Sequence, residues 1–165
     1  MDLISNWNEV KNLFKDSFKS SFHFSIASVS ENGEPHVTPV GSLILGKPGQ
    51  GIYFEKFPQL LPLYFKSNNR VCIMAVNSGR WFWFKSLFKG EFSTPPAVRL
   101  YGEVGTLRKA TNTEIALWEK RVKSVSFTKG HALIWRGMSQ VRDIKFDRIE
   151  AVNIGQMTRN NWKNQ

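Results

Sequence analysis

Residues 22–76 decide the fold: FHFSIASVSENGEPHVTPVGSLILGKPGQGIYFEKFPQLLPLYFKSNNRVCIMAV. Residues 22–27 alternate apolar with polar or small side chains, a pattern that predicts a half-buried strand. Asn32-Gly33 supplies the positive backbone angles of a tight hairpin turn, so a returning strand is expected over about 36–45. Pro39 within that strand indicates a sheet edge or a bulge, because proline cannot donate a ladder hydrogen bond.

The rest of this stretch predicts a short strand, a short helix and a central strand. Glycines and a proline over 46–51 mark a loop, and Ile52–Glu55 reads as the strand that follows it. Pro58 can start a helix that runs to about Lys66. Val71–Val76 is continuously apolar, as a strand buried on both faces would be.

Helical patterns lie outside this stretch on both sides. Apolar residues over 3–18 recur at steps of three and four, and Asn6 with Glu9 predicts a capping box that starts the helix near Trp7. Thr111 with Glu114 predicts a second capping box, ahead of an apolar helical stripe at Ile115, Trp118, Val122 and Val125.

The carboxyl-terminal half also predicts strands. Val98–Leu107 alternates over a long strand with a bend at Gly102, and further strands are expected at 132–135, 141–146 and 149–154. Short strands with turn signals between them and a few peripheral helices predict a mainly β protein, a closed antiparallel barrel. We expect one domain over 1–165: a helix over 1–20, a barrel with short helices over 22–155, and a polar tail over 156–165 that frays unless Trp162 docks on a partner.

Composition restricts the surroundings of the protein. Apolar residues make up 41% of the 165 residues, and no run approaches the roughly 20 that a membrane helix needs. The lone Cys72 excludes an internal disulfide and fits a reducing compartment, and the amino terminus lacks a signal-peptide pattern. A soluble, cytoplasmic protein without a membrane partner is expected.

The net charge of +10 has two interpretations. A basic protein attracts anionic partners such as a phosphorylated cofactor, an acidic substrate or nucleic acid. The 23 Lys and Arg residues are scattered without a block, and no nucleic-acid motif is present. The favoured interpretation is therefore a solubilising surface, and nucleic-acid binding ranks lowest.

Catalytic motifs are sparse. His23, His36 and His131 show no metal-ligand spacing, and the sequence lacks HExxH, CxxC, GxSxG, GxGxxG and Walker A patterns. Metal, α/β-hydrolase, Rossmann and P-loop sites are therefore not supported. This pattern fits a cofactor protein, because the cofactor then carries the chemistry, and it fits a non-enzyme equally well.

Several segments, in order, resemble the FMN-binding split-barrel family of pyridoxamine 5′-phosphate oxidase: ENGEPHVTPV (31–40), GIYF (51–54), FKSNNRVCIM (65–74) and VRLYGEVGTL (98–107). The resemblance covers about residues 20 to 110 well and the carboxyl-terminal third loosely. It implies a split β-barrel, Greek-key-like, that forms a homodimer with FMN at the subunit interface. It also implies an oxidoreductase that transfers a hydride to or from a small molecule.

The same resemblance implies site residues. Thr38, Pro39 and Val40 would border the flavin ring. The family's phosphate-binding Thr, Ser and Lys or Arg correspond to Glu55, Gln59 and Leu61, which are poor phosphate ligands. Lys56 or Lys66 could compensate, with a surface charge as the alternative for both. Replacing Glu55 by Thr and Leu61 by Lys together is then expected to tighten FMN binding.

Other candidates stay open. Arg99 and Arg142 could pair with a phosphate or with an internal carboxylate. The aromatic run Arg80–Phe84 could stack on a planar ligand, with Arg80, Lys85 and Lys89 attracting anions, or form a lid or a dimer contact. The alternative function is a non-catalytic barrel that holds haem, another planar ligand or no cofactor; the substrate and the electron donor are not indicated.

Overall fold

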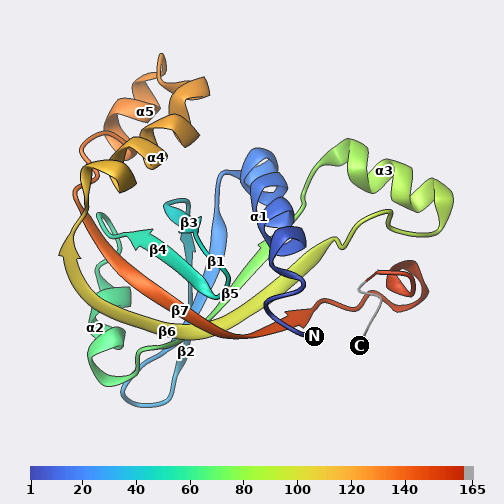
Figure 1. The fold of residues 1–165 in the computed structure, drawn as a ribbon, viewed down its shortest axis with the longest axis horizontal. Coiled ribbons are helices and arrows are strands. Elements are labelled where there is room, and N and C mark those ends of the chain that lie inside the picture. Colours follow the sequence, from blue (N-terminus) through green and yellow to red (C-terminus); the bar gives the residue numbers. More distant parts are fainter. Residues whose placement is uncertain (162–165) are drawn as a thin grey trace.

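A seven-stranded sheet with helices around it forms the body of the protein (Figure 1). The computed structural model describes residues 1–161. The strands are β1 (Phe24–Val29), β2 (Pro35–Val40), β3 (Leu43–Leu45), β4 (Gln50–Phe54), β5 (Arg70–Val76), β6 (Ala97–Lys109) and β7 (Gln140–Ala151). The helices are α1 (Trp7–Ser21), α2 (Leu60–Ser67), α3 (Arg80–Lys89), α4 (Asn112–Val122) and α5 (Lys129–Ile134), with short 3₁₀ helices η1 (Lys123–Val125) and η2 (Gly155–Thr158).

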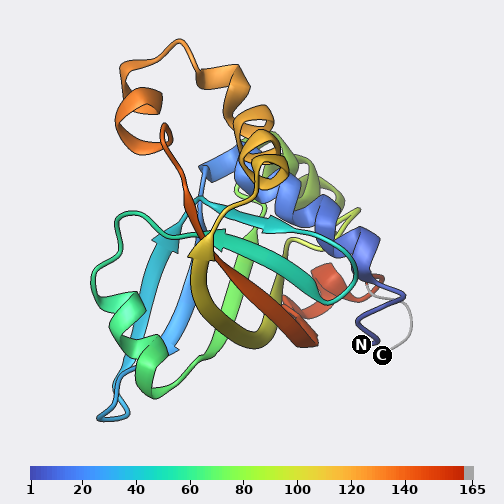
Figure 2. The ribbon, with the colours of Figure 1, turned by 60° about the vertical axis from the view of Figure 1, so that its left-hand side comes forward.

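The sheet is antiparallel throughout and strongly curled. Its strand order is β2-β1-β5-β6-β7-β4-β3. The long strands β6 and β7 bend together around the body (Figure 2). A register shift falls between Tyr101 and Gly102, where a Cβ on Gly102 would clash with the carbonyl oxygen of Lys145. The bend therefore requires glycine at this position. The sheet is a half-barrel rather than a closed barrel, because its two end strands, β2 and β3, are not paired with each other.

The core fills the inner side of this curl. Helix α1 buries Val10, Phe14 and Phe18 there, and the Phe14 ring lies 4.9 Å from the ring of Phe24 on β1. Each such side chain contributes roughly 1.5–3 kcal/mol of hydrophobic stabilisation. The Ser17 and Ser20 hydroxyls accept hydrogen bonds from the N–H groups of residues 76 and 78, which fixes α1 to the end of β5.

The structure confirms the mainly β, split-barrel fold class and corrects five details. The one strand expected over 36–45 is two strands, β2 and β3, which lie at opposite ends of the sheet. Residues 132–135 are not a strand: the chain forms α5, where the Thr128 hydroxyl accepts from the His131 N–H. The strands expected at 141–146 and 149–154 are one continuous strand, β7. Asn6 makes no side-chain cap; its amide donates to the carbonyl of Asp2 instead. The barrel is open, as described above. The expectation for Trp162 in the polar tail lies outside the described residues.

Residues 1–161 contain neither a membrane-spanning helix nor a cluster of metal-binding side chains. No helix there is long and apolar enough to cross a membrane. No group of three or more His, Cys, Asp or Glu side chains is arranged to hold a metal ion in that part of the chain.

Candidate ligand-binding site

A small pocket lies where the end of β2 meets the end of β4. Its volume is about 150 Å³, and its walls are Pro39, Val40, Gly41, Ser42, Tyr53, Phe54, Lys56, Phe57, Pro58, Ile134, Trp135 and Met138. Three predicted site residues, Pro39, Val40 and Lys56, therefore come together here. Sites for drug-sized ligands usually measure roughly 300–1,000 Å³, so one chain provides only part of such a site.

Two residues at this pocket carry a buried hydroxyl group without a hydrogen-bond partner among the described residues: Tyr53, which lines the pocket, and Thr38, one residue before Pro39. Burial raises the pKa of Tyr53, and the Glu55 carboxylate raises it further, against an opposing effect of Arg142. Tyr53 is thus a neutral donor at ordinary pH. A buried hydroxyl without a partner costs about 1–3 kcal/mol, which a hydrogen-bonding ligand would recover.

Glu55 and Arg142 form an internal ion pair beside the pocket. Arg142 Nε donates to Glu55 Oε2 at 2.6 Å and Nη2 donates to Oε1 at 3.1 Å, with the side chains 13% and 10% exposed. The guanidinium also lies 5.4 Å from the ring centre of Phe65 and donates to the carbonyl of Gly105. The antiparallel register places Tyr53 opposite Arg142, which brings the pair together across β4 and β7. Each charge is therefore already neutralised by its neighbour.

The remaining phosphate candidates are dispersed. Lys56 Nζ donates to the carbonyl of Arg136 at 2.6 Å, and Lys66 is exposed in the last turn of α2. Leu61 is only 1% exposed and belongs to the core, so lysine at this position would be buried. The combined Glu55→Thr and Leu61→Lys substitution is therefore a poor test of FMN binding, because its second part would damage the core.

Arg99 does not line the pocket. Its Nη1 donates to Glu150 Oε1 at 2.7 Å, and Glu150 Oε2 accepts from Tyr101 Oη at 3.1 Å. The guanidinium of Arg148 stacks 3.6 Å from the Tyr101 ring centre. Arg99 thus belongs to a polar cluster on the outer face of the sheet.

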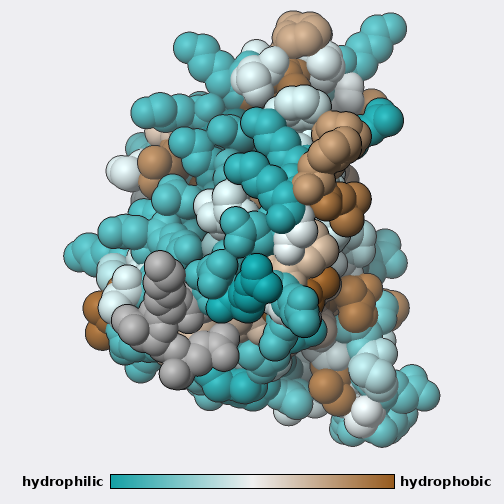
Figure 3. Space-filling view, turned by 90° about the vertical axis from the view of Figure 1, so that its right-hand side faces the viewer, coloured by the Kyte–Doolittle hydropathy of each residue, from teal (hydrophilic) through white to brown (hydrophobic). Residues whose placement is uncertain are grey.

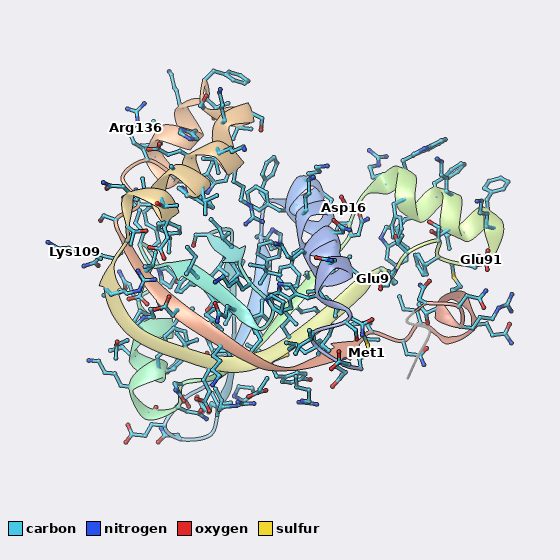
Figure 4. The ribbon with its side chains drawn as sticks, in the orientation of Figure 1. Met1, Glu9, Asp16, Glu91, Lys109 and Arg136 are labelled. Carbon is cyan, nitrogen blue, oxygen red and sulfur yellow. The ribbon has the colours of Figure 1, made fainter. Side chains whose placement is uncertain are left out.

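The aromatic run forms helix α3, which extends away from the sheet (Figure 4). Trp83 and Phe82 face the protein: Trp83 Nε1 donates to the carbonyl of Asn77, and the Phe82 ring stacks on Phe92. Trp81 and Phe84 stack on each other and are 65% and 53% exposed. In a view of this side of the molecule, hydrophobic side chains lie next to hydrophilic ones on the surface (Figure 3). No residue of α3 lines the pocket within the same chain.

A second cavity lies between α4 and α5, and sequence reasoning missed it. It measures about 640 Å³, and Trp118, His131, Trp135 and Met138 are among its lining residues. His131 Nδ1 is buried without a hydrogen-bond partner within residues 1–161. The sequence offered no signal for this groove, because the segment was expected to be a strand.

Comparison with known proteins identifies the architecture. No family model and no curated protein matches the chain. Solved structures do match. HupZ from Group A Streptococcus is 17% identical, with a TM-score of 0.59 over 90% of this chain and 94% of its own. A general stress protein 26-related protein of the pyridoxinephosphate oxidase family from Clostridium acetobutylicum is 14% identical, with a TM-score of 0.55 over 93% and 92%.

Two further matches bind different ligands by their names. An FMN-binding protein from Syntrophomonas wolfei is 12% identical, with a TM-score of 0.54 over 92% of this chain and 95% of its own. HutZ, a haem storage protein from Vibrio cholerae, is 11% identical, with a TM-score of 0.50 over 92% and 95%. The chain has the split-barrel fold of pyridoxamine 5′-phosphate oxidase-like proteins. At these identities the likeness establishes the fold of this split barrel and leaves its ligand open.

Proposed function

We propose that this split barrel binds the ring system of a flavin, FMN in the first instance, in the pocket between β2 and β4. The observation that carries the proposal is the unpaired hydroxyl of Tyr53, a buried residue that lines the pocket together with Pro39 and Val40. A flavin ring presents carbonyl and nitrogen acceptors along one edge and apolar faces. Tyr53 could donate to that edge, while Val40 and Trp135 would cover a face.

The bound flavin would supply hydride transfer, which makes the protein an oxidoreductase acting on a small molecule. The residues of this chain would orient the ring and exclude water. Trp135 and Met138 close the pocket on the side of α5, and Lys56 supplies the nearest positive charge in its wall. No residue of the pocket is assigned as an acid or base.

The second subunit completes the site in this proposal. The pocket volume of about 150 Å³ is too small for a whole cofactor, and the exposed aromatic residues of α3 lie away from it within one chain. A homodimer would bring residues of the partner subunit to the open side of each pocket.

The residues at the expected phosphate-binding positions distinguish this proposed site from a usual FMN site. Among the expected anchor positions, Glu55 is paired with Arg142, which cancels its charge, and Leu61 is buried in the core. We therefore expect FMN and riboflavin to bind within about tenfold of each other, since the phosphate gains little more than about 1 kcal/mol from exposed charges. Absorbance and fluorescence titrations of both ligands measure this ratio.

Tyr53→Phe tests the ring contact. Loss of one hydrogen bond of about 1 kcal/mol is expected to weaken flavin binding about fivefold, without loss of folding. Tyr64→Phe, on α2 and outside the pocket, is the matched control and should bind normally. A colourless protein that ignores both flavins would overturn the proposal.

The α4–α5 groove supports a second candidate, haem binding. The specific observation is the unpaired Nδ1 of His131 in an aromatic-lined groove of about 640 Å³, with Lys120, Lys123 and Arg136 around it. An imidazole is a common axial haem ligand, and the lysines and the arginine could pair with the propionates. A Soret band on haem addition that disappears in His131→Ala and persists in His23→Ala would support this candidate over the flavin.

A further inference from the structure

A groove between α1, β3 and α4 combines an apolar floor with positive charge. It measures about 390 Å³ and shares no lining residue with the β2–β4 pocket. Its walls are Lys11, Asn12, Phe14, Lys15, Phe18, Lys19, Leu43, Ile44, Leu45 and Arg121. Four of these residues are cations and none is acidic, so the groove concentrates positive potential.

The three lysines form a row along α1. Lys11, Lys15 and Lys19 are four residues apart and therefore project from the same side of the helix. Like charges at this spacing repel each other by a few tenths of a kcal/mol per pair. None of the three forms an ion pair with any residue in 1–161. The row is thus not neutralised within the described chain.

Arg121 is the most unusual member of the groove. Its guanidinium lies 4.2 Å from the ring centre of Phe18 and 5.5 Å from that of Phe24, and Nη1 donates to the carbonyl of Leu43. Burial lowers the pKa of Arg121 to about 10. Within residues 1–161 it pairs with no carboxylate, whereas Arg108 binds two and Arg142 binds one. A largely buried cation is normally paired, because desolvation of an uncompensated charge is costly.

We propose that this groove is a binding site for an amphiphilic anion, a carboxylate or phosphate monoester joined to an apolar chain. The anionic group would bind Arg121 and the lysine row, and the chain would lie on Ile44 and Leu45 at the floor. A guanidinium binds either anion through paired N–H groups, so the structure specifies the shared chemistry of the two. The site is independent of the flavin proposal, because the groove and the pocket are separate.

Calorimetric titration of the full chain with four probes tests the site: octyl phosphate, octanoate, inorganic phosphate and octanol, each below its micelle concentration. Octyl phosphate and octanoate should bind, inorganic phosphate should bind more weakly, and octanol should not bind measurably. The ratio of the affinities for octyl phosphate and octanoate then identifies the preferred anionic group. Equal binding of octanol, or no binding of either anionic amphiphile, overturns the proposal.

Substitutions locate the binding. Lys11→Gln with Lys15→Gln should weaken octyl phosphate binding about tenfold, as expected when two charge-assisted contacts are lost. Lys109→Gln with Lys145→Gln removes the same charge from exposed positions on β6 and β7, outside the groove, and should leave affinity unchanged. Arg121→Lys is preferred to Arg121→Gln because it keeps the positive charge and is therefore less liable to misfold. It should retain part of the affinity. Equal losses in both lysine pairs would indicate non-specific attraction and sink the idea.

Discussion

The Glu55–Arg142 pair shows how two residues change what a fold can bind. Both side chains are nearly buried, and they satisfy each other through two hydrogen bonds. Resemblance to FMN-binding barrels places Glu55 where a phosphate ligand is expected, but the carboxylate serves Arg142 instead. Arg142 cannot bind a phosphate without releasing Glu55 into a buried environment, which is unfavourable.

Glu55→Gln is expected to destabilise the protein by about 3 kcal/mol, because it leaves the Arg142 charge buried without a counter-charge. Urea unfolding followed by circular dichroism measures the loss. Glu103→Gln is the matched control: its carboxylate lies 3.6 Å from Arg70 at the surface with 57% of the side chain exposed, so a change below about 0.5 kcal/mol is expected. Similar losses in the two variants would show that the buried pair contributes nothing special.

At the scale of elements, the first turn of α4 is held by a hydrogen-bond network that contains an ionisable carboxylate, that of Glu114. Thr111 and Glu114 form the capping box, and Arg108 binds both Glu114 and Asp143. Hydrogen bonds from Arg108, opposed by burial, lower the pKa of Glu114 from 4.5 to about 2. A lowered carboxyl pKa stabilises the fold fully above the unfolded value of 4.5, and the contribution is lost as pH falls toward 2.

Glu114→Gln should therefore cost about 1–2 kcal/mol at pH 6 and progressively less between pH 4.5 and 2. Urea midpoints of wild type and variant across this range measure the difference. Glu119→Gln, on the same helix but outside the network, should show no such convergence. A difference that stays constant from pH 6 to pH 2.5 would contradict the assigned pKa.

The elements differ in how well sequence predicts them. The capping box at Thr111 is local, three residues apart, and the prediction is confirmed. The hairpin around Gly33, with φ of 82°, is also encoded locally. The prediction of a strand over 132–135 was wrong. The apolar run is too short to distinguish the helical period of 3.6 residues from the strand period of two, and the Thr128 side chain caps the first turn of a helix here.

The candidate site was less predictable than the fold. Pro39, Val40 and Lys56 do line one pocket. They could be predicted because the family resemblance rests on strand motifs that follow one another along the chain. The partner of Glu55 lies 87 residues away along the chain, and no sequence spacing could reveal it. The same holds for Arg121, which reaches β3 across 78 residues, and for the groove that it lines.

At the scale of the whole molecule, the outer face of the sheet is a candidate for the subunit interface. The side chains of Ala27, Cys72 and Met74 alternate with core residues on β1 and β5 and are half-buried, next to the Arg99–Glu150 pair. A surface with small and apolar side chains around a satisfied polar pair resembles a dimer interface more than a solvated face. Burial also raises the pKa of the Cys72 thiol, which makes it less reactive.

Met74→Glu should therefore convert a homodimer into a monomer, because it places one charge from each subunit against an apolar surface. Sedimentation velocity at several concentrations measures the association, with Phe127→Glu as the control, since Phe127 is 86% exposed outside this face.

The Cys72 thiol provides a second readout: its reaction with a thiol reagent should be slow in the dimer and faster in Met74→Glu. Because the proposed flavin site needs both subunits, flavin affinity should fall together with dimerisation. A monomeric wild type would remove this interface and leave the anion groove unaffected, since all the residues of that groove come from one chain.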